Sequence, residues 1–149
     1  MKKVEIEVKL NQEYEGTKVV IYTNEMSDQI DNIISKLQDI TDEKIIGYKN
    51  EEAFILEKDE IECVYAEDKK IYARVNNETY QIKKRIFELE KILYENNFVR
   101  TSNSEIVNFK KVTSMDFKIT GTIILKLESG NITYTSRRYI KKIKEYLGI

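Results

Sequence analysis

The chain has 149 residues, of which 41% are hydrophobic and 34% charged, and its formal net charge at pH 7 is −1. This length and composition predict one domain, or one domain with a small appendage, and a real hydrophobic core. The sequence has no histidine, no proline and a single cysteine, Cys63. These absences exclude a Ser-His-Asp triad, a histidine-ligated metal and an internal disulfide framework. We therefore expect no enzyme activity, no cofactor, no metal and no small-molecule substrate.

The N-terminus, MKKVEIEVKLNQEYEG, alternates acidic with aliphatic residues, which is unlike a signal peptide. No apolar run approaches the roughly 20 residues that span a bilayer. Cys63 lies in the alternating run IECVYA, with no Lys, Arg or His beside it, which is typical of a buried structural thiol. A lone thiol is also typical of a reducing compartment, so we expect a cytoplasmic protein.

The first fifty-odd residues predict a small acidic β-β-α-β unit. Residues 3–10 alternate with a period of two, and residues 18–22 predict a second strand. Apolar residues recur at helical spacing within 26–40, with Thr23, Asn24 and Ser27 as candidate N-caps. The third and fourth expected strands lie at 44–48 and 53–57.

From residue 60 onward the pattern predicts short strands and two helices. The expected strands are 61–66, 71–75, 79–82, 105–109, 112–117, 122–127 and 132–135, with tight turns at 67–70 and 76–77. Apolar residues from Ile82 to Leu93 mark the first helix, and Ser136 is the expected N-cap of the second. The sequence has no internal repeat.

The charges are divided unevenly along the chain. Residues 1–60 hold 8 Lys and Arg against 15 Asp and Glu, residues 61–96 hold 7 of each, and residues 97–149 hold 10 against 4. The C-terminal third therefore carries a surplus of six positive charges, and this surplus predicts an anionic partner.

Two polar segments lie in this basic part. The first has Arg100 followed by Ser102, Asn103 and Ser104 in a turn, and such groups bind phosphates and base edges, although they also satisfy local backbone groups. The second places two arginines at the start of the last helix, Arg137 and Arg138. Cations there oppose the helix dipole, and a bound phosphate would relieve the conflict.

Four segments, in this order, closely resemble the LytTR family of bacterial DNA-binding domains: ELEKIL, FVRTSNSEIVN, TGTIILKLESG and TSRRYIKKIKEYLG. The resemblance runs from about Ile55 to Ile149 and is strongest from Leu89 onward. The N-terminal unit is too short for a doubly wound receiver domain, so the chain resembles the small, receiver-less members. We accordingly expect an extension at 1–52, for dimerisation or regulation, and a LytTR-type DNA-binding domain at 53–149.

The resemblance implies an α+β, mostly β fold of short antiparallel strands with a C-terminal helix, which presents loops to DNA. The family's contact positions correspond to Lys69 or Lys70 in the first hairpin turn, Asn103 in the central turn and Arg138 near the last helix. The first of these is often a histidine elsewhere in the family, and this chain has none. The resemblance also implies paired direct repeats in the DNA, a homodimer, and a membrane protein as a regulatory partner.

The sequence thus predicts a cytoplasmic bacterial transcription regulator that binds duplex DNA sequence-specifically. The expected DNA-binding residues are Lys69, Lys70, Arg100, Ser102, Asn103, Arg137 and Arg138. The alternatives are a protein-interaction or anion-sensing module that uses the basic strip, or RNA binding. Readers of single-stranded RNA favour exposed aromatic residues, whereas Tyr134, Tyr139 and Tyr146 fall on core-like periods. Steep salt dependence together with sequence preference would distinguish duplex DNA.

Overall fold

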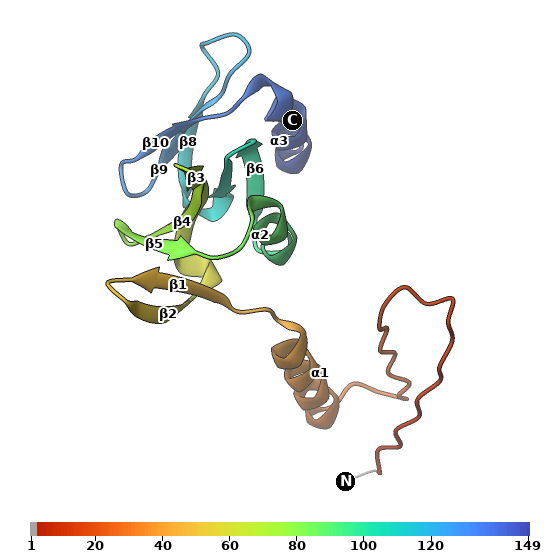
Figure 1. The fold of residues 1–149 in the computed structure, drawn as a ribbon. Helices are drawn as coiled ribbons and strands as arrows, with labels where there is room; N and C mark the ends of the chain where they lie inside the picture. The colour runs from red at the N-terminus through yellow and green to blue at the C-terminus, as the bar shows by residue number, and fades with distance from the viewer. Residues whose placement is uncertain (1–2) are drawn as a thin grey trace. The chain divides into compact units, whose positions relative to one another are not determined.

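The computed structural model describes residues 3–149, the side chain of Thr41 excepted. The chain divides into two compact units, Met1–Thr41 and Asp42–Ile149, which Figure 1 shows as a ribbon. The sequence suggested a boundary at residue 52, but the second unit begins earlier. The reason is that strands β1 (Ile45–Lys49) and β2 (Glu52–Leu56) form a hairpin that joins the sheet of the second unit.

Within its described residues the first unit has one helix, α1 (Asp28–Thr41). The N–H of Ile30 donates to the hydroxyl of Ser27 at 3.3 Å, so Ser27, of the three candidates, caps this helix. Residues 3–27 form neither helix nor strand. The strands expected at 3–10 and 18–22 are therefore absent from this part of the chain.

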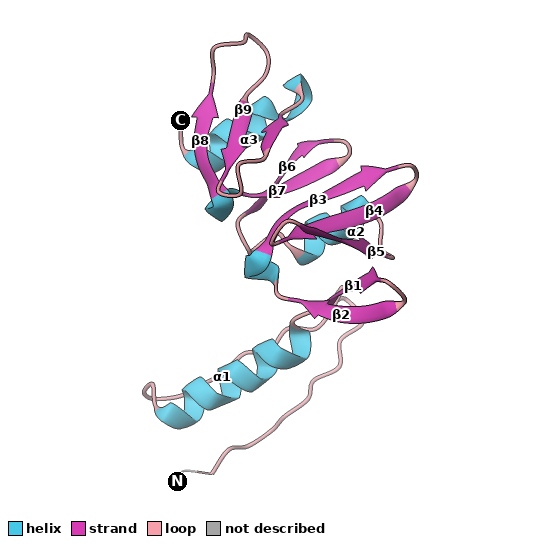
Figure 2. Cartoon of the chain, turned by 90° about the vertical axis from the view of Figure 1, so that its left-hand side faces the viewer, coloured by secondary structure: helices cyan, strands magenta, loops and turns pink. Residues whose placement is uncertain are grey.

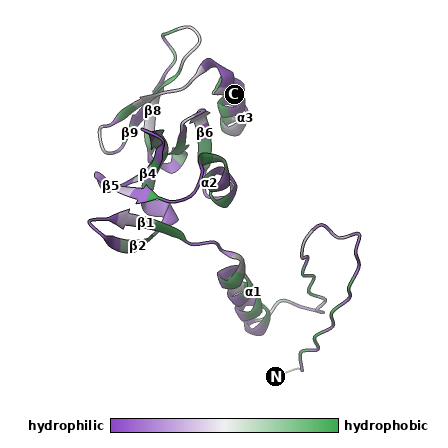
Figure 3. Ribbon diagram, in the orientation of Figure 1, coloured by the Kyte–Doolittle hydropathy of each residue, from purple (hydrophilic) through white to green (hydrophobic). Residues whose placement is uncertain are grey.

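Residues 3–10 have the alternation of a strand and residues 18–22 are mostly apolar, but neither segment pairs with another described segment. Ile6 is 89% exposed and Leu10 is 94% exposed, so the apolar face of the first segment is not packed on a core. Figure 3 shows hydrophobic and hydrophilic residues interspersed along this unit. An isolated two-stranded hairpin is marginal in water, because its backbone and side chains gain too little from a single neighbour. The alternation alone is thus not enough to form these strands.

The second unit contains the remaining elements. Its further strands are β3 (Ile61–Glu67), β4 (Lys70–Val75), β5 (Glu78–Ile82), β6 (Phe98–Ser102), β7 (Glu105–Asn108), β8 (Val112–Asp116), β9 (Ile124–Leu127) and β10 (Ile132–Tyr134). Its helices are α2 (Ile86–Ile92) and α3 (Ile140–Leu147), with three short 3-10 helices, η1 (Lys58–Glu60), η2 (Phe109–Lys111) and η3 (Arg137–Tyr139). None of the helices in the described residues is long and apolar enough to cross a membrane.

The strands form two antiparallel sheets, seen in Figure 2. The larger sheet has the order β2-β1-β5-β4-β3-β7-β6, and the smaller has the order β10-β9-β8. The α+β, mostly β fold with a C-terminal helix is confirmed. Strand β6 was not predicted from the sequence, and neither were the 3-10 helices η1, η2 and η3. Helix α2 is shorter than the apolar stripe from Ile82 to Leu93 because Ile82 ends β5.

Strands β3, β6 and β7 are covered on both faces. One face carries Val64, Phe98 and Ile106, which pack in a core with Leu89 of α2. The other face packs in a second core, made by Cys63, Val99, Val107, Ile123, Leu125, Leu127 and Ile143. Cys63 is buried, as predicted, and burial raises the pKa of its thiol to about 12. This thiol is therefore inert in the folded chain.

A buried carboxylate links the two sheets. Glu62 of β3 is 4% exposed and accepts hydrogen bonds from Arg74 of β4 at 3.1 Å and from Asn131, before β10, at 3.0 Å. The hydroxyl of Ser129 also donates to it. A buried charge is tolerated only where such partners satisfy it. Glu62 thus fixes the β9–β10 turn against the large sheet.

Candidate nucleic-acid interface

Strand register places two turns at the same end of the large sheet. β3 pairs with both β4 and β7, with Glu67 opposite Lys70 and Tyr65 opposite Glu105. The N–H of Ala66 donates to the carbonyl of Ser104 at 2.8 Å. The β3–β4 turn and the β6–β7 turn therefore both lie where β3 ends. We call residues 67–70 and 102–104 the loop end.

The β3–β4 turn carries two lysines expected to contact DNA. Asp68 and Lys69 have φ angles of 50° and 66°, so both central residues are left-handed, as in a type I′ hairpin turn. Lys69 and Lys70 are exposed, and no carboxylate in the described residues pairs with either. Both ammonium groups are free to meet an anion.

Arg100, unlike the two lysines, is already bonded to other residues of the chain. Its guanidinium donates to the carbonyl of Ser102 at 3.0 Å and to the carbonyl of Asn103 at 2.6 Å. It also pairs with Glu90 at 3.3 Å, and its side chain is only 13% exposed. Glu90 in turn pairs with Lys142 of α3 at 3.3 Å. The geometry supports a role for Arg100 in holding the turn rather than in contacting a ligand.

The serines of the central turn also bond within it. The hydroxyl of Ser102 accepts from the N–H of Ser104 at 3.2 Å and lies 3.4 Å from the Ser104 hydroxyl. Asn103 is exposed, and its side-chain oxygen accepts from the hydroxyl of Tyr139 at 2.9 Å. The turn therefore presents one amide outward, and Tyr139 connects that amide to the C-terminal segment.

The C-terminal segment begins beside the same turn. The N–H of Ser136 donates to the carbonyl of Thr101 at 2.8 Å, and η3 starts at the next residue. Ser136 was expected to cap the last helix, but it precedes η3 and its hydroxyl makes no capping bond, whereas the N-cap position of α3 is taken by Tyr139. The two arginines that follow, Arg137 and Arg138, are exposed and have no ion pair with any described residue. Two unpaired guanidinium groups therefore directly follow Ser136, the residue whose N–H is bonded to β6.

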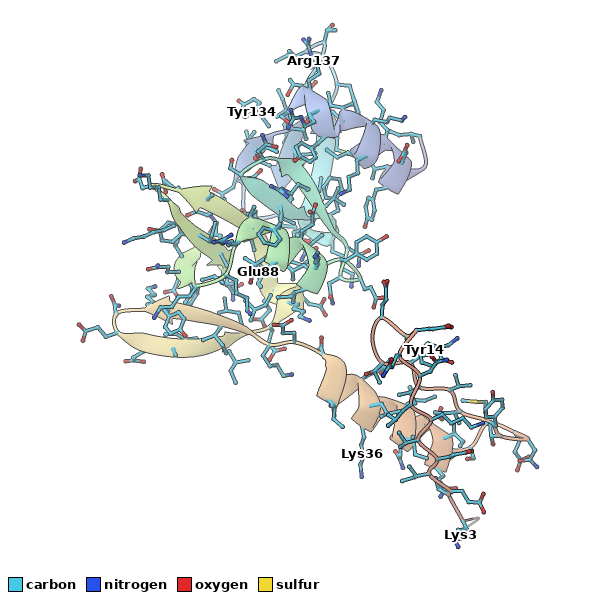
Figure 4. All side chains as sticks on the ribbon, turned by 45° about the vertical axis from the view of Figure 1, so that its right-hand side comes forward. Lys3, Tyr14, Lys36, Glu88, Tyr134 and Arg137 are labelled. Carbon is cyan, nitrogen blue, oxygen red and sulfur yellow. The ribbon has the colours of Figure 1, made fainter. Side chains whose placement is uncertain are left out.

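The side chain of Arg137 lies against Gly121, a residue that the sequence does not mark as part of the site. Figure 4 shows Arg137 at one end of the second unit. Gly121, between β8 and β9, has a φ of 84°, and a Cβ atom on it would lie 2.8 Å from the Nε of Arg137. The absence of that side chain lets the guanidinium rest against the β8–β9 loop. A positive φ and a close neighbour are the two properties that favour glycine at a position.

The structure therefore brings together most of the residues expected from the sequence. Asn103 is joined to the segment of Arg137 and Arg138 through Tyr139, and register places the two lysines of the β3–β4 turn at the same sheet end. Free cations beside an exposed amide suit a polyanion whose bases offer hydrogen-bond acceptors. Tyr139 was expected only as a core or rim residue, and no spacing in the sequence reveals its bond to residue 103.

Comparison with known proteins identifies the fold and the family of the second unit. The family model described as the LytTr DNA-binding domain matches residues 51–148. A solved LytTr DNA-binding domain, from a protein of Bacillus cereus described as a methyl-accepting/DNA response regulator, has a TM-score of 0.68. The two are 21% identical, and the match covers 72% of this chain and 99% of that chain. At 21% identity this match shows that the two chains share a fold, and no more than that.

Sequence relatives extend the likeness along the chain. A protein of Staphylococcus aureus strain NCTC 8325 / PS 47, described as an uncharacterized HTH-type transcriptional regulator, is 33% identical over 130 residues, 87% of this chain and 88% of its own. A counterpart in strain MRSA252 is 32% identical over the same shares. Because the family model begins at residue 51, these matches also reach into the N-terminal unit. The chain belongs to the LytTR family of DNA-binding domain proteins.

Proposed function

We propose that the chain is a bacterial transcription regulator that recognises a specific duplex DNA sequence through its loop end and the 3-10 helix η3, which precedes α3. The observation that supports this best is the set of unpaired cations in this region: Lys69, Lys70, Arg137 and Arg138. Elsewhere in the second unit some lysines, such as Lys49 and Lys84, pair with carboxylates at 3.3 and 3.1 Å and others do not, so the support comes from the grouping of these four unpaired cations around the Asn103 turn. Cations without a protein partner favour a polyanionic ligand.

The roles of these residues follow from their chemistry. A guanidinium donates two parallel hydrogen bonds to the O6 and N7 atoms of guanine, so Arg138 recognises a base in the major groove. Lys69, Lys70 and Arg137 contact phosphates and position the protein on the duplex. Asn103 recognises a second base. Arg100 and Ser102 hold the turn that presents Asn103.

Selection from random duplex DNA tests this proposal. The full chain should enrich one sequence, and binding to it should weaken steeply with added salt, by a slope of about −0.9 for each phosphate contact. We expect two direct repeats in the enriched sequence, one for each protomer of a dimer. A chain that binds without sequence preference, or binds RNA more tightly than duplex DNA, would contradict the proposal.

The first unit, in this proposal, joins two protomers. Its exposed aliphatic residues need a partner, and a second copy supplies the same surface. The fragment 42–149 should fold and keep sequence preference, because it retains the whole sheet and every expected DNA contact. It should be monomeric at micromolar concentration, whereas the full chain is dimeric, and it should bind the paired site more weakly. Light scattering and titration with the selected site measure both effects. Equal monomeric masses would exclude dimerisation through this unit.

Replacing Lys69 by glycine should change stability and DNA binding in opposite directions. Glycine adopts a positive φ without strain, so the free energy of unfolding should rise by about 0.5–1 kcal/mol. Loss of the ammonium group should weaken binding to all sequences alike and reduce the salt slope by about one contact.

The matched control is Asp68→Gly, in the same turn and with the same backbone requirement. It should stabilise the fold while DNA affinity stays the same or rises, since the lost charge is negative. Denaturant unfolding and a salt series measure both properties. If Lys69→Gly binds DNA like the parent at every salt concentration, Lys69 contributes no phosphate contact.

A further inference from the structure

The amide of Asn103 is fixed by bonds on its inner side. The Tyr139 hydroxyl donates to its side-chain oxygen at 2.9 Å, and Arg100 donates to its backbone carbonyl at 2.6 Å. Tyr139 is itself held, because its ring packs against the second core and lies 5.9 Å from the guanidinium of Arg100. Glu90 anchors that guanidinium from α2 at 3.3 Å. The side chain of Asn103 is thus oriented before any ligand arrives.

This orientation decides which polar group faces outward. A carboxamide has one acceptor oxygen and one NH2 group with two donors. The Tyr139 hydroxyl takes one of the two acceptor positions of the Asn103 oxygen and fixes the amide, whereas no described residue accepts a hydrogen bond from its NH2 group, so both donors are open to a ligand. Adenine is normally bound by both groups at once, with the amide oxygen accepting from N6 and the NH2 group donating to N7. An amide oxygen that already accepts from Tyr139 has one acceptor position left and a fixed direction, so the paired contact with adenine is weakened.

We propose that Tyr139 determines which base Asn103 recognises, by holding its amide as a donor, which favours guanine or thymine over adenine, whose edge offers one acceptor beside the N6 donor. The inference rests on the proposed function and concerns one position of the site. Guanine offers O6 and N7, and thymine offers O4, as acceptors on the major-groove edge. Tyr139 is a positioning residue, since it acts through Asn103 and not on the DNA.

Tyr139→Phe tests the inference because it removes only the hydroxyl and keeps the packed ring. Bound sequences are selected from random duplex DNA with the full chain and with Asn103→Ala, which identifies the position that Asn103 recognises. The parent should prefer guanine or thymine there. With Tyr139→Phe the freed amide should accept adenine at that position, and affinity for the parent's site should fall about three- to tenfold. The base at the position that Arg138→Ala identifies should stay the same.

Tyr146→Phe is the matched control. The hydroxyl of Tyr146 donates to the side-chain oxygen of Asn97 at 2.9 Å, the same bond outside the proposed interface. Its base preferences and affinity should equal those of the parent. Thermal unfolding of Tyr139→Phe and Tyr146→Phe would show whether the two lose comparable stability.

Several results would overturn the inference. An adenine preference in the parent at the Asn103 position would do so, as would an unchanged base order with Tyr139→Phe. A loss of preference spread over all positions would make Tyr139 a general structural residue. If Asn103→Ala weakens all sequences equally, Asn103 contacts phosphate, and the inference fails while the proposed function stands. If the parent enriches no sequence at all, the proposed function itself fails.

Discussion

Replacing Arg138 by alanine is expected to reduce affinity for the selected DNA site by about 1–3 kcal/mol, or roughly five- to 160-fold. The side chain is exposed, has no ion pair within the described residues and follows the bond that joins Ser136 to β6. Because no carboxylate among the described residues holds this guanidinium, it can donate hydrogen bonds to both O6 and N7 of a guanine. Loss of the bidentate contact should relax base preference at one position and leave affinity for scrambled DNA almost unchanged.

Arg137→Ala is the matched control, because it removes the same side chain from the neighbouring position. Successive residues of a 3-10 helix point about 120° apart, so both arginines of η3 cannot face one base. Arg137 rests against Gly121 in the β8–β9 loop, which suits a phosphate contact. Arg137→Ala should therefore weaken all sequences alike and reduce the salt slope by about one contact.

Both variants are measured against the selected site and scrambled DNA across a salt series. If Arg138→Ala keeps the parent's affinity and base preference, Arg138 contacts no base. A uniform loss for Arg138→Ala and a position-specific loss for Arg137→Ala would exchange the two roles. Neither substitution should unfold the protein, since both side chains are exposed at the surface.

Most strands of the second unit could be predicted because their pattern of apolar and polar residues matches the buried and exposed sides of the sheet. Two-residue turns with positive φ, at Asn76-Asn77 for example, follow alternating runs and close hairpins. Strand β6 was missed for a physical reason. Its residues Phe98 and Val99 are buried on opposite faces and three polar residues follow them, so hydrophobic and polar residues do not alternate along the strand.

The first unit shows the opposite case. Val4, Ile6, Val8 and Leu10 alternate as clearly as any strand in the chain, yet residues 3–27 form none. Alternation shows that a segment can present one apolar face, but a strand also needs a neighbour for its backbone groups. The sequence does not show where such a neighbour is.

The candidate site was predictable where residue type alone carries the chemistry. Residue type points to the polar turn at 102–104 and to the pair Arg137 and Arg138, and the resemblance to the LytTR family selects Asn103 and Arg138 among them. The structural use of Arg100 and the bond from Tyr139 depend on segments that meet only in the folded chain. Counting the cations in a sequence therefore overestimates how many can contact DNA, because the sequence does not show which cations, such as Arg100, are bonded within the folded chain.

Glu62→Ala is expected to lower the free energy of unfolding of the second unit by about 3 kcal/mol, since it removes one partner of a largely buried ion pair. The change leaves the guanidinium of Arg74 and the polar groups of Ser129 and Asn131 without their acceptor. The β9–β10 turn would then lose its attachment to the large sheet. Urea unfolding at pH 7 measures the loss.

The same carboxylate should make stability depend on pH. Burial opposes ionisation of Glu62, but hydrogen bonds from Ser129, Asn131 and Arg74, with the charge of Arg74, outweigh it and hold the pKa of Glu62 below its ordinary value of 4.5. A folded-state pKa below the unfolded one stabilises the fold at pH values above the unfolded pKa. That contribution should be lost as pH falls from 4.5 through the lowered folded-state pKa.

Glu62→Gln separates the charge of Glu62 from its hydrogen bonds. The amide oxygen can still accept from Arg74 and Asn131, while its NH2 group donates to the hydroxyl of Ser129, so the loss at pH 7 should be about 1 kcal/mol. The difference in stability between the parent and Glu62→Gln should be constant from pH 7 to pH 5 and should shrink in more acidic solution. If Glu62→Ala unfolds at the same urea concentration as the parent, or if the parent and Glu62→Gln respond identically to acid, Glu62 does not join the two sheets as the structure indicates.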